Sequence, residues 1–271
     1  MTDVVLRGCL CLSIVAVLTN LADAEPVRIL PLGDSITEQG NPGYRYELWK
    51  QLVDAQVDFD IIGSMHGAGE KGPAQWPEHK GKAFDTDHEG HSGWTSSDLL
   101  RGCDWELGRG KLQEWLKHYT PDVVFLHIGT NDAFHVTPTD ETIANIGTAI
   151  DQLRAANPKV TIFLAKIIPL CGQWEREYDP NVIAINNRIP GVAKEKGTRK
   201  SRIIVVDHYS SFDRQRDTDD EIHPNALGQQ KMAARWADAF FAAARRTPTK
   251  FGIRPNAAPR MKCGRAITCA R

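Results

Sequence analysis

The chain has 271 residues, of which 41% are hydrophobic and 25% charged, and its formal net charge is −1 at pH 7. These proportions are those of a globular domain with one sizeable core, and they exclude a largely disordered chain. A net charge so close to zero gives no reason to expect a nucleic-acid partner. Beyond the first residues, no apolar segment is long enough to span a membrane.

The first 24 residues have the pattern of a secretory signal peptide. Arg7 precedes an apolar run from Leu10 to Leu18, and the small-residue motif Ala22-Asp23-Ala24 follows it. We therefore expect residues 1–24 to be removed and a secreted protein to begin at Glu25. The alternative is that the apolar run forms a buried strand or helix of the fold.

The C-terminal end differs in charge from the rest of the chain. Residues 245–271 contain eight basic residues and no acidic one, so the remainder of the mature chain is correspondingly acidic. Such a segment can bind a polyanion, fold back on the acidic body or remain disordered, and we favour the last two. We expect one domain over residues 25–246 and a basic, proline-containing tail over residues 247–271.

Four cysteines remain in the mature chain: Cys103, Cys171, Cys263 and Cys269. In an exported protein four cysteines can form two disulfides, although their spacing does not determine the pairing. No Cys-x-x-Cys pair indicates a zinc or redox site.

Alternating strands and helices are predicted along the body of the chain. Apolar, β-branched runs predict five buried strands, at Val27–Leu32, Phe59–Ile62, Val123–Ile128, Val160–Ile168 and Arg202–Val206. Helical spacing of apolar residues predicts helices at Tyr44–Ala55, Leu112–His118, Glu141–Ala156, Asn181–Lys196 and Asn225–Arg245. This alternation is typical of an α/β fold, a three-layer α/β/α sandwich around a parallel sheet. Residues 63–93 show little periodicity and predict a long loop.

Polar residues follow several of these strands. Ser35, in Gly33-Asp34-Ser35, follows the first strand, Gly93 follows the second, and Asn131 follows the third. Asp220 and His223 follow the fifth. Because ligands bind beyond the carboxyl ends of the strands in an open α/β sheet, these residues are expected to meet at one edge.

These residue types suit acyl transfer by a serine nucleophile. The Ser35 hydroxyl needs a base to remove its proton, and His223 can supply it while Asp220 fixes the histidine tautomer. The backbone N–H groups of Ser35 and Gly93 and the amide of Asn131 can stabilise the oxyanion. The pattern predicts a hydrolase that forms an acyl-enzyme and needs no cofactor and no metal. Asp34 is too close to Ser35 in sequence to orient His223 and is expected to be a turn residue or to support the site through another residue.

At these residues the chain resembles the SGNH, or GDSL, hydrolases, over residues 27–244. The resemblance implies a flavodoxin-like five-stranded parallel sheet, with Ser35, His223 and Asp220 as the catalytic residues. Three further stretches, Gly43–Leu48, Asp87–Trp94 and Ile222–Asn225, are similar to the carbohydrate esterase family 3 branch, which includes acetylxylan esterases. That similarity implies an acetylated polysaccharide as substrate.

Aromatic residues near the predicted site are candidates for stacking on sugar rings. Trp94 adjoins Gly93 and is the best candidate for substrate binding, followed by Tyr44. Trp76, Phe134 and Trp174 also fall in loops or near strand ends. The alternative for each ring is ordinary packing in the core.

The sequence alone does not decide the role of one residue cluster in the long loop, nor does it decide between several alternative functions. The cluster comprises Asp85, Asp87, His88, Glu89 and His91. It is either a metal site or a network that positions Gly93, and the second is favoured because the spacing matches no zinc motif. The alternatives to a polysaccharide deacetylase are a lipid or aryl esterase, a carbohydrate-binding protein, and a metal-dependent phosphoesterase built on Asp34, Asn131, Asp132 and the His88/His91 loop. The oligomeric state is not predicted.

Overall fold

The computed structural model describes residues 25–38, 43–67 and 75–253. The predicted signal peptide lies outside the described residues, as do residues 254–271 of the predicted tail with Cys263 and Cys269. Among the described residues, no helix combines the length and the apolar composition needed to cross a bilayer.

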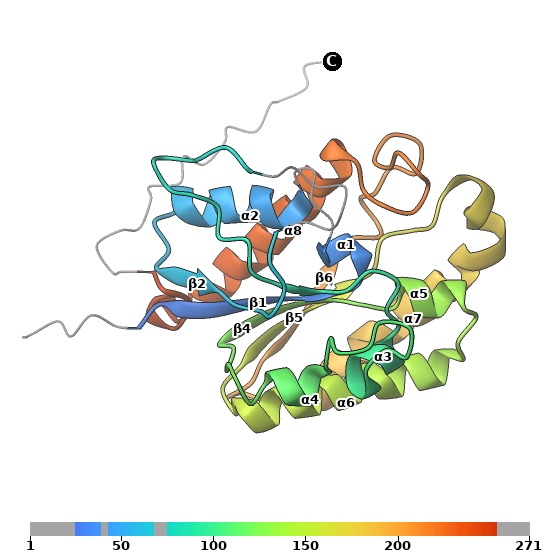
Figure 1. Cartoon of the computed structure of the whole chain (residues 1–271), viewed down its shortest axis with the longest axis horizontal. Coiled ribbons are helices and arrows are strands. Elements are labelled where there is room, and N and C mark those ends of the chain that lie inside the picture. The colour runs from blue at the N-terminus through green and yellow to red at the C-terminus, as the bar shows by residue number, and fades with distance from the viewer. Residues whose placement is uncertain (1–24, 39–42, 68–74, 254–271) are drawn as a thin grey trace, which may run out of the picture.

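A parallel sheet forms the centre of the protein (Figure 1). Its strands are β1 Val27–Gly33, β2 Phe59–Ile61, β3 Glu89–Gly90, β4 Val123–His127, β5 Thr161–Lys166 and β6 Ile203–Asp207. The main path runs β2-β1-β4-β5-β6, and every pairing along it is parallel. The five predicted strands are therefore confirmed. The two-residue β3, which pairs with the end of β1, lies in the segment expected to be a loop and makes a sixth strand.

The helices are α1 Ser35–Glu38, α2 Gly43–Asp54, α3 Ser96–Arg101, α4 Leu112–Trp115, α5 Thr130–Phe134, α6 Thr139–Ala156, α7 Gly172–Lys196 and α8 Ala226–Ala244. All five predicted helices are present. However, α7 begins well before the predicted start at Asn181, and Pro180 lies inside it. Three short helices, α1, α3 and α5, were not predicted, because their four to six residues are too few to show a helical period. The equally short α4 was predicted from a longer apolar pattern that runs on to His118.

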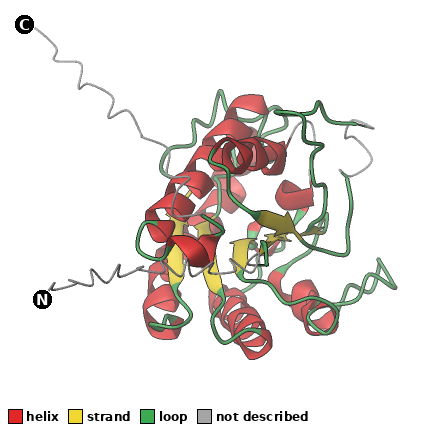
Figure 2. Cartoon of the chain, turned by 90° about the vertical axis from the view of Figure 1, so that its left-hand side faces the viewer, coloured by secondary structure: helices red, strands yellow, loops and turns green. Residues whose placement is uncertain are grey.

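The helices cover both faces of the sheet (Figures 1 and 2). Helices α2 and α8 pack on one face, where Phe125 and Phe163 contact Trp236 and Phe240 of α8. Helices α3, α4, α6 and α7 cover the other face. Successive residues of each central strand point to opposite faces and are buried on both, which explains their continuous apolar sequence.

The packed body extends beyond the predicted boundary at residue 246. A 3₁₀ helix, Pro248–Phe251, follows α8, and the Phe251 ring is fully buried against Phe163 and Phe240. The backbone N–H of Asp58 donates to the Gly252 carbonyl at 2.9 Å. Residues 247–253, which were expected in the tail, are thus held to the body by an apolar anchor.

Cys103 and Cys171 are buried free thiols, so they do not form one of the two disulfides considered above. Cys103 lies in the loop between α3 and α4, and Cys171 lies at the start of α7. Burial raises the pKa of the Cys171 thiol to about 11, which keeps it protonated and unreactive.

Candidate active site

Ser35 lies just after the carboxyl end of strand β1, where the chain turns into α1. Gly33 leaves no room for a side chain, because a Cβ there would collide with the carbonyl group of His127 on β4. The Asp34 carboxylate accepts a hydrogen bond from the N–H of Ile36 at 3.0 Å, which holds the turn. Asp34 is therefore a turn residue, as its position suggested. Burial raises the pKa of its carboxyl from 3.8 to about 6.

The structure brings Ser35, His223 and Asp220 into one chain of hydrogen bonds. Ser35 Oγ lies 2.9 Å from His223 Nε2, and His223 Nδ1 lies 2.7 Å from Asp220 Oδ2. With the proton on Nδ1, the ring donates to Asp220 and accepts from the serine hydroxyl. Burial raises the pKa of the Asp220 carboxyl, but hydrogen bonds from the backbone and ring of His223 outweigh it, so the pKa lies below its usual value. Asp220 therefore stays ionised.

The loop that carries His223 is held at both ends. Asp220 Oδ1 accepts from the backbone N–H of Ile222 at 3.1 Å and of His223 at 2.7 Å, which makes a tight turn around Glu221. At the start of α8, the N–H of Asn225 donates to the carbonyl of Asp217 at 2.8 Å. These contacts fix the imidazole toward β1 before any substrate binds.

Two of the expected oxyanion donors lie side by side. Asn131 Nδ2 donates to the carbonyl of Trp94, the residue after Gly93, at 2.8 Å, which uses one of its two amide hydrogens and leaves the other. Gly93 has a φ of +77°, a conformation that disfavours any side chain. Among the described residues its N–H has no hydrogen-bond acceptor. Ser35 begins α1, where the first N–H groups of a helix have no intrahelical acceptor.

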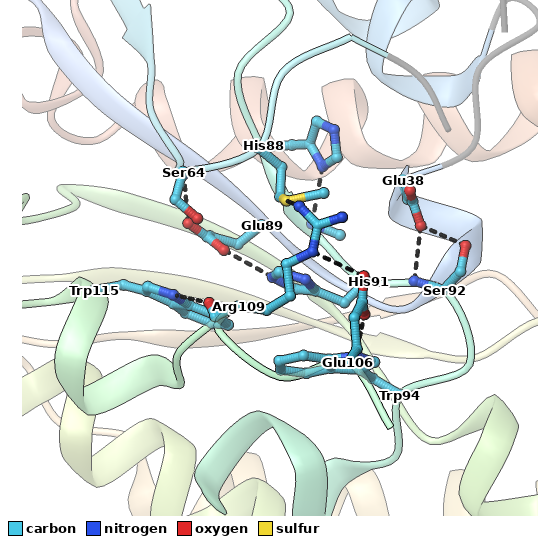
Figure 3. Close-up of polar contacts among 12 residues, drawn as sticks. Glu38, Ser64, His88, Glu89, His91, Ser92, Trp94, Glu106, Arg109 and Trp115 are labelled. Atoms are coloured by element: carbon cyan, nitrogen blue, oxygen red, sulfur yellow. Dashed lines mark hydrogen bonds and ion pairs between the residues drawn. The ribbon is translucent and has the colours of Figure 1, made fainter. Parts of the chain in front are cut away.

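A buried network supports the loop that carries Gly93 (Figure 3). The carboxylate of Glu89, fully buried, accepts from His91 Nε2 at 2.8 Å, from the N–H of Ser64 and from the hydroxyl of Tyr119. The His91 ring packs on the indoles of both Trp94 and Trp115, with centroids 4.2 Å and 4.8 Å away, and the two indoles also contact each other. Glu89 and His91 thus belong to a hydrogen-bonded network beneath the loop of Gly93, which is the alternative that we favoured over a metal site.

The residues of the metal-dependent alternative are engaged elsewhere. Asp132 accepts from the N–H of Ser96 at 2.8 Å and from its hydroxyl at 2.5 Å, which joins α5 to α3. His91 contacts Glu89 as described. Within residues 25–38, 43–67 and 75–253, no group of three histidine, cysteine or acidic side chains is arranged to hold a metal ion.

The expectation that Trp94 and Tyr44 bind substrate is wrong. Trp94 has no exposed surface, because its ring packs on His91 and Nε1 donates to Glu106 at 2.9 Å. Tyr44 is only 1% exposed and its hydroxyl lies 3.1 Å from that of Thr37. Neither ring can offer a face to a sugar. Of the other aromatic candidates, Phe134 and Trp174 pack on each other, with ring centroids 5.2 Å apart, and Trp76 packs edge-on against the Phe84 ring.

Two residues near the site were missed from the sequence. Glu38 accepts from the N–H of Ser92 at 2.7 Å and from its hydroxyl, and so ties the helix of the nucleophile to the loop of Gly93 (Figure 3). Trp105, with 67% of its surface exposed, lies against Gly93. The only sequence signal for Glu38 was its place three residues after Ser35, and Trp105 gave none.

Comparison with known proteins agrees with this geometry. Residues 32–231 match the GDSL-like lipase/acylhydrolase family. A carbohydrate esterase family 3 protein of Talaromyces cellulolyticus is 30% identical, with a TM-score of 0.68 over 81% of this chain and 99% of that one. A family 3 carbohydrate esterase of Clostridium thermocellum is also 30% identical, with a TM-score of 0.64 over 82% of this chain and 98% of that one.

A multidomain esterase of Ruminococcus flavefaciens is 29% identical over 229 residues, which are 79% of this chain and 28% of that protein. This chain thus spans a little over a quarter of that relative. The family model matches most of the length of this chain, which therefore belongs to the GDSL-like lipase/acylhydrolase family. Members of this family hydrolyse carboxylic esters, so this chain is classed as a carboxylic ester hydrolase.

Proposed function

We propose that the chain is a secreted esterase that removes acetyl groups from a polysaccharide of the acetylxylan type. The observation that carries the proposal is the hydrogen-bonded chain from Ser35 through His223 to Asp220. Similar proteins named carbohydrate esterases, at 30% identity, support the sugar ester as substrate. The predicted signal peptide supports export.

The reaction begins with attack by Ser35 Oγ on the acetyl carbonyl carbon. The serine proton passes to His223 Nε2, and the carbonyl oxygen becomes an anion that accepts hydrogen bonds from the N–H groups of Ser35 and Gly93 and from Asn131. Asp220 stabilises the imidazolium. The sugar alcohol then leaves with the proton from His223, and the acetyl group stays on Ser35.

A water molecule completes the cycle. His223 takes one proton of this water while its oxygen attacks the acetyl-serine carbonyl, and the same donors hold the second oxyanion. Acetate leaves, and the proton on His223 returns to Ser35 Oγ. The proton transfers between Ser35 and His223 are supported by the hydrogen bonds that join Ser35 Oγ to His223 and His223 to Asp220.

The test compares ester substrates that differ in the acyl group or in the alcohol. We expect higher kcat/KM for p-nitrophenyl acetate than for p-nitrophenyl octanoate, and acetate release from acetylated xylan. A strong preference for octanoate would favour a lipid esterase of the same fold. Tight binding of glycan without acetate release would indicate a carbohydrate-binding protein.

A further inference from the structure

Trp105 is an unusually exposed aromatic residue for a folded protein. It shows 67% of its surface, and its neighbour Leu107 shows 84%. Both lie in the loop between α3 and α4. Large apolar side chains that are exposed together mark contact surfaces for a ligand or partner.

The loop around Trp105 is held by two buried indoles (Figure 3). Trp94 Nε1 donates to Glu106 at 2.9 Å, and Glu106 also accepts from Arg109 Nε at 2.8 Å. Trp115 Nε1 donates to the Arg109 carbonyl at 2.8 Å. The residues that follow Trp105 are therefore fixed to the network beneath Gly93. The Trp105 ring is therefore attached to a segment that is already held in place, which lowers the entropy cost when a ligand binds to the ring.

The ring of Trp105 lies beside a candidate oxyanion donor. A Cβ placed on Gly93 would be 3.2 Å from both Cζ2 and Cη2 of the indole. One edge of the ring therefore lies against the backbone of Gly93, whose N–H is a candidate oxyanion donor, while most of the residue stays exposed. A ligand held by its acetyl group at Ser35 and Gly93 would bring its alcohol part near this ring.

We propose that Trp105 is the platform on which a sugar ring of the polysaccharide stacks while its acetyl group is held at Ser35. This inference rests on the function proposed above. The C–H face of a sugar is apolar enough to pack on an indole, and its hydroxyl groups remain in water. Trp105 thus takes the role that the sequence assigned to Trp94, and it makes the site selective for acetylated glycans over small esters.

The first arm of the test is kinetic, with the chain from Glu25 onward. We expect Trp105→Ala to lower kcat/KM on acetylated xylo-oligosaccharides about tenfold more than on p-nitrophenyl acetate. Trp105→Phe should restore most of the difference, because it keeps an aromatic face. Ile183→Ala removes another exposed apolar side chain, on α7, and should change neither rate. Equal losses on both substrates, or a larger loss on the octanoyl ester, would overturn the platform.

The second arm measures binding without turnover. Ser35→Ala should be retarded in a native gel that contains soluble acetylated xylan, and the double variant Ser35→Ala/Trp105→Ala should not. Retardation of both variants alike, or of neither, contradicts the inference. Acetate release by the wild-type protein is recorded separately. Its absence, with retardation that depends on Trp105, would reject the proposed reaction and keep the platform.

Discussion

Ser35 Oγ lies 2.9 Å from His223 Nε2, although 188 residues separate the two in sequence. The contact exists because both residues follow parallel strands, β1 and β6, whose carboxyl ends face the same edge of the sheet. The Ser35 turn is fixed by Asp34, and the His223 turn is fixed by Asp220. A short serine–histidine distance is thus a consequence of the fold rather than of a flexible loop.

The negative charge on Asp220 is expected to contribute more to kcat than its hydrogen bonds with the backbone. Asp220→Asn keeps an oxygen for the N–H groups of Ile222 and His223, but it no longer favours the tautomer with the proton on Nδ1. We predict a fall in kcat on the order of a hundredfold to a thousandfold. Steady-state kinetics with p-nitrophenyl acetate measure it. Asp219→Asn, which changes a neighbouring exposed carboxylate, is the matched control and should keep full activity.

Glu38 is expected to position the loop that carries Gly93, a candidate oxyanion donor. Glu38→Ala removes the acceptor for Ser92 and should lower kcat for p-nitrophenyl acetate about tenfold, with little change in KM, because the donors then lose preorganisation. Glu38→Gln keeps an acceptor oxygen and should retain most of the rate. Glu47→Ala on α2, which breaks only an ion pair with Lys50, provides the control. Equal losses in the Ala and Gln variants would mean that Glu38 acts through its charge.

The buried carboxyl of Asp34 predicts a pH-dependent stability. Its pKa is raised from 3.8 to about 6 by burial, so folding favours the protonated form. The stability it contributes is complete below pH 3.8 and is lost as the pH rises through 6. The wild type should therefore lose roughly 2 kcal/mol of unfolding free energy between pH 4 and pH 7 that Asp34→Asn keeps. Urea unfolding at several pH values measures this, and a constant difference would contradict it.

Much of this architecture could be predicted from the sequence, for a physical reason. Central strands of a parallel sheet are buried on both faces, so β4 and β5 are unbroken apolar runs that few other structures explain. The candidate nucleophile, base and acid were predictable because Ser35 follows β1 while Asp220 and His223 follow β6, and the carboxyl ends of parallel strands meet at one edge of the sheet.

The environment of single aromatic residues could not be predicted. Trp94 and Trp105 are the same residue type in neighbouring loops, yet one is fully buried and the other 67% exposed. The difference depends on His91 and Trp115, which stack on Trp94. Such contacts become visible only when the loop is folded. The same holds for Phe251, whose isolated position after a basic stretch gave no sign of a core role.

Phe251 is expected to stabilise the domain substantially. Phe251→Ala removes a fully buried ring from contact with Phe163 and Phe240 and should lower the free energy of unfolding by about 3–5 kcal/mol. A chain that ends after Arg246 should be destabilised at least as much, whereas one that ends after Ile253 should keep most of the stability. Urea denaturation of the three variants distinguishes them, and an unchanged midpoint for the shorter chain would show that residues 247–253 are dispensable.

The most direct test of the central claim is acetate release from acetylated xylan by the wild-type chain and by Ser35→Ala, measured side by side. We predict release by the wild type and a rate lower by about a thousandfold or more in the variant, because no other hydroxyl contacts His223 Nε2 among the described residues. Release at the wild-type rate by Ser35→Ala would contradict the assignment of Ser35 as the nucleophile.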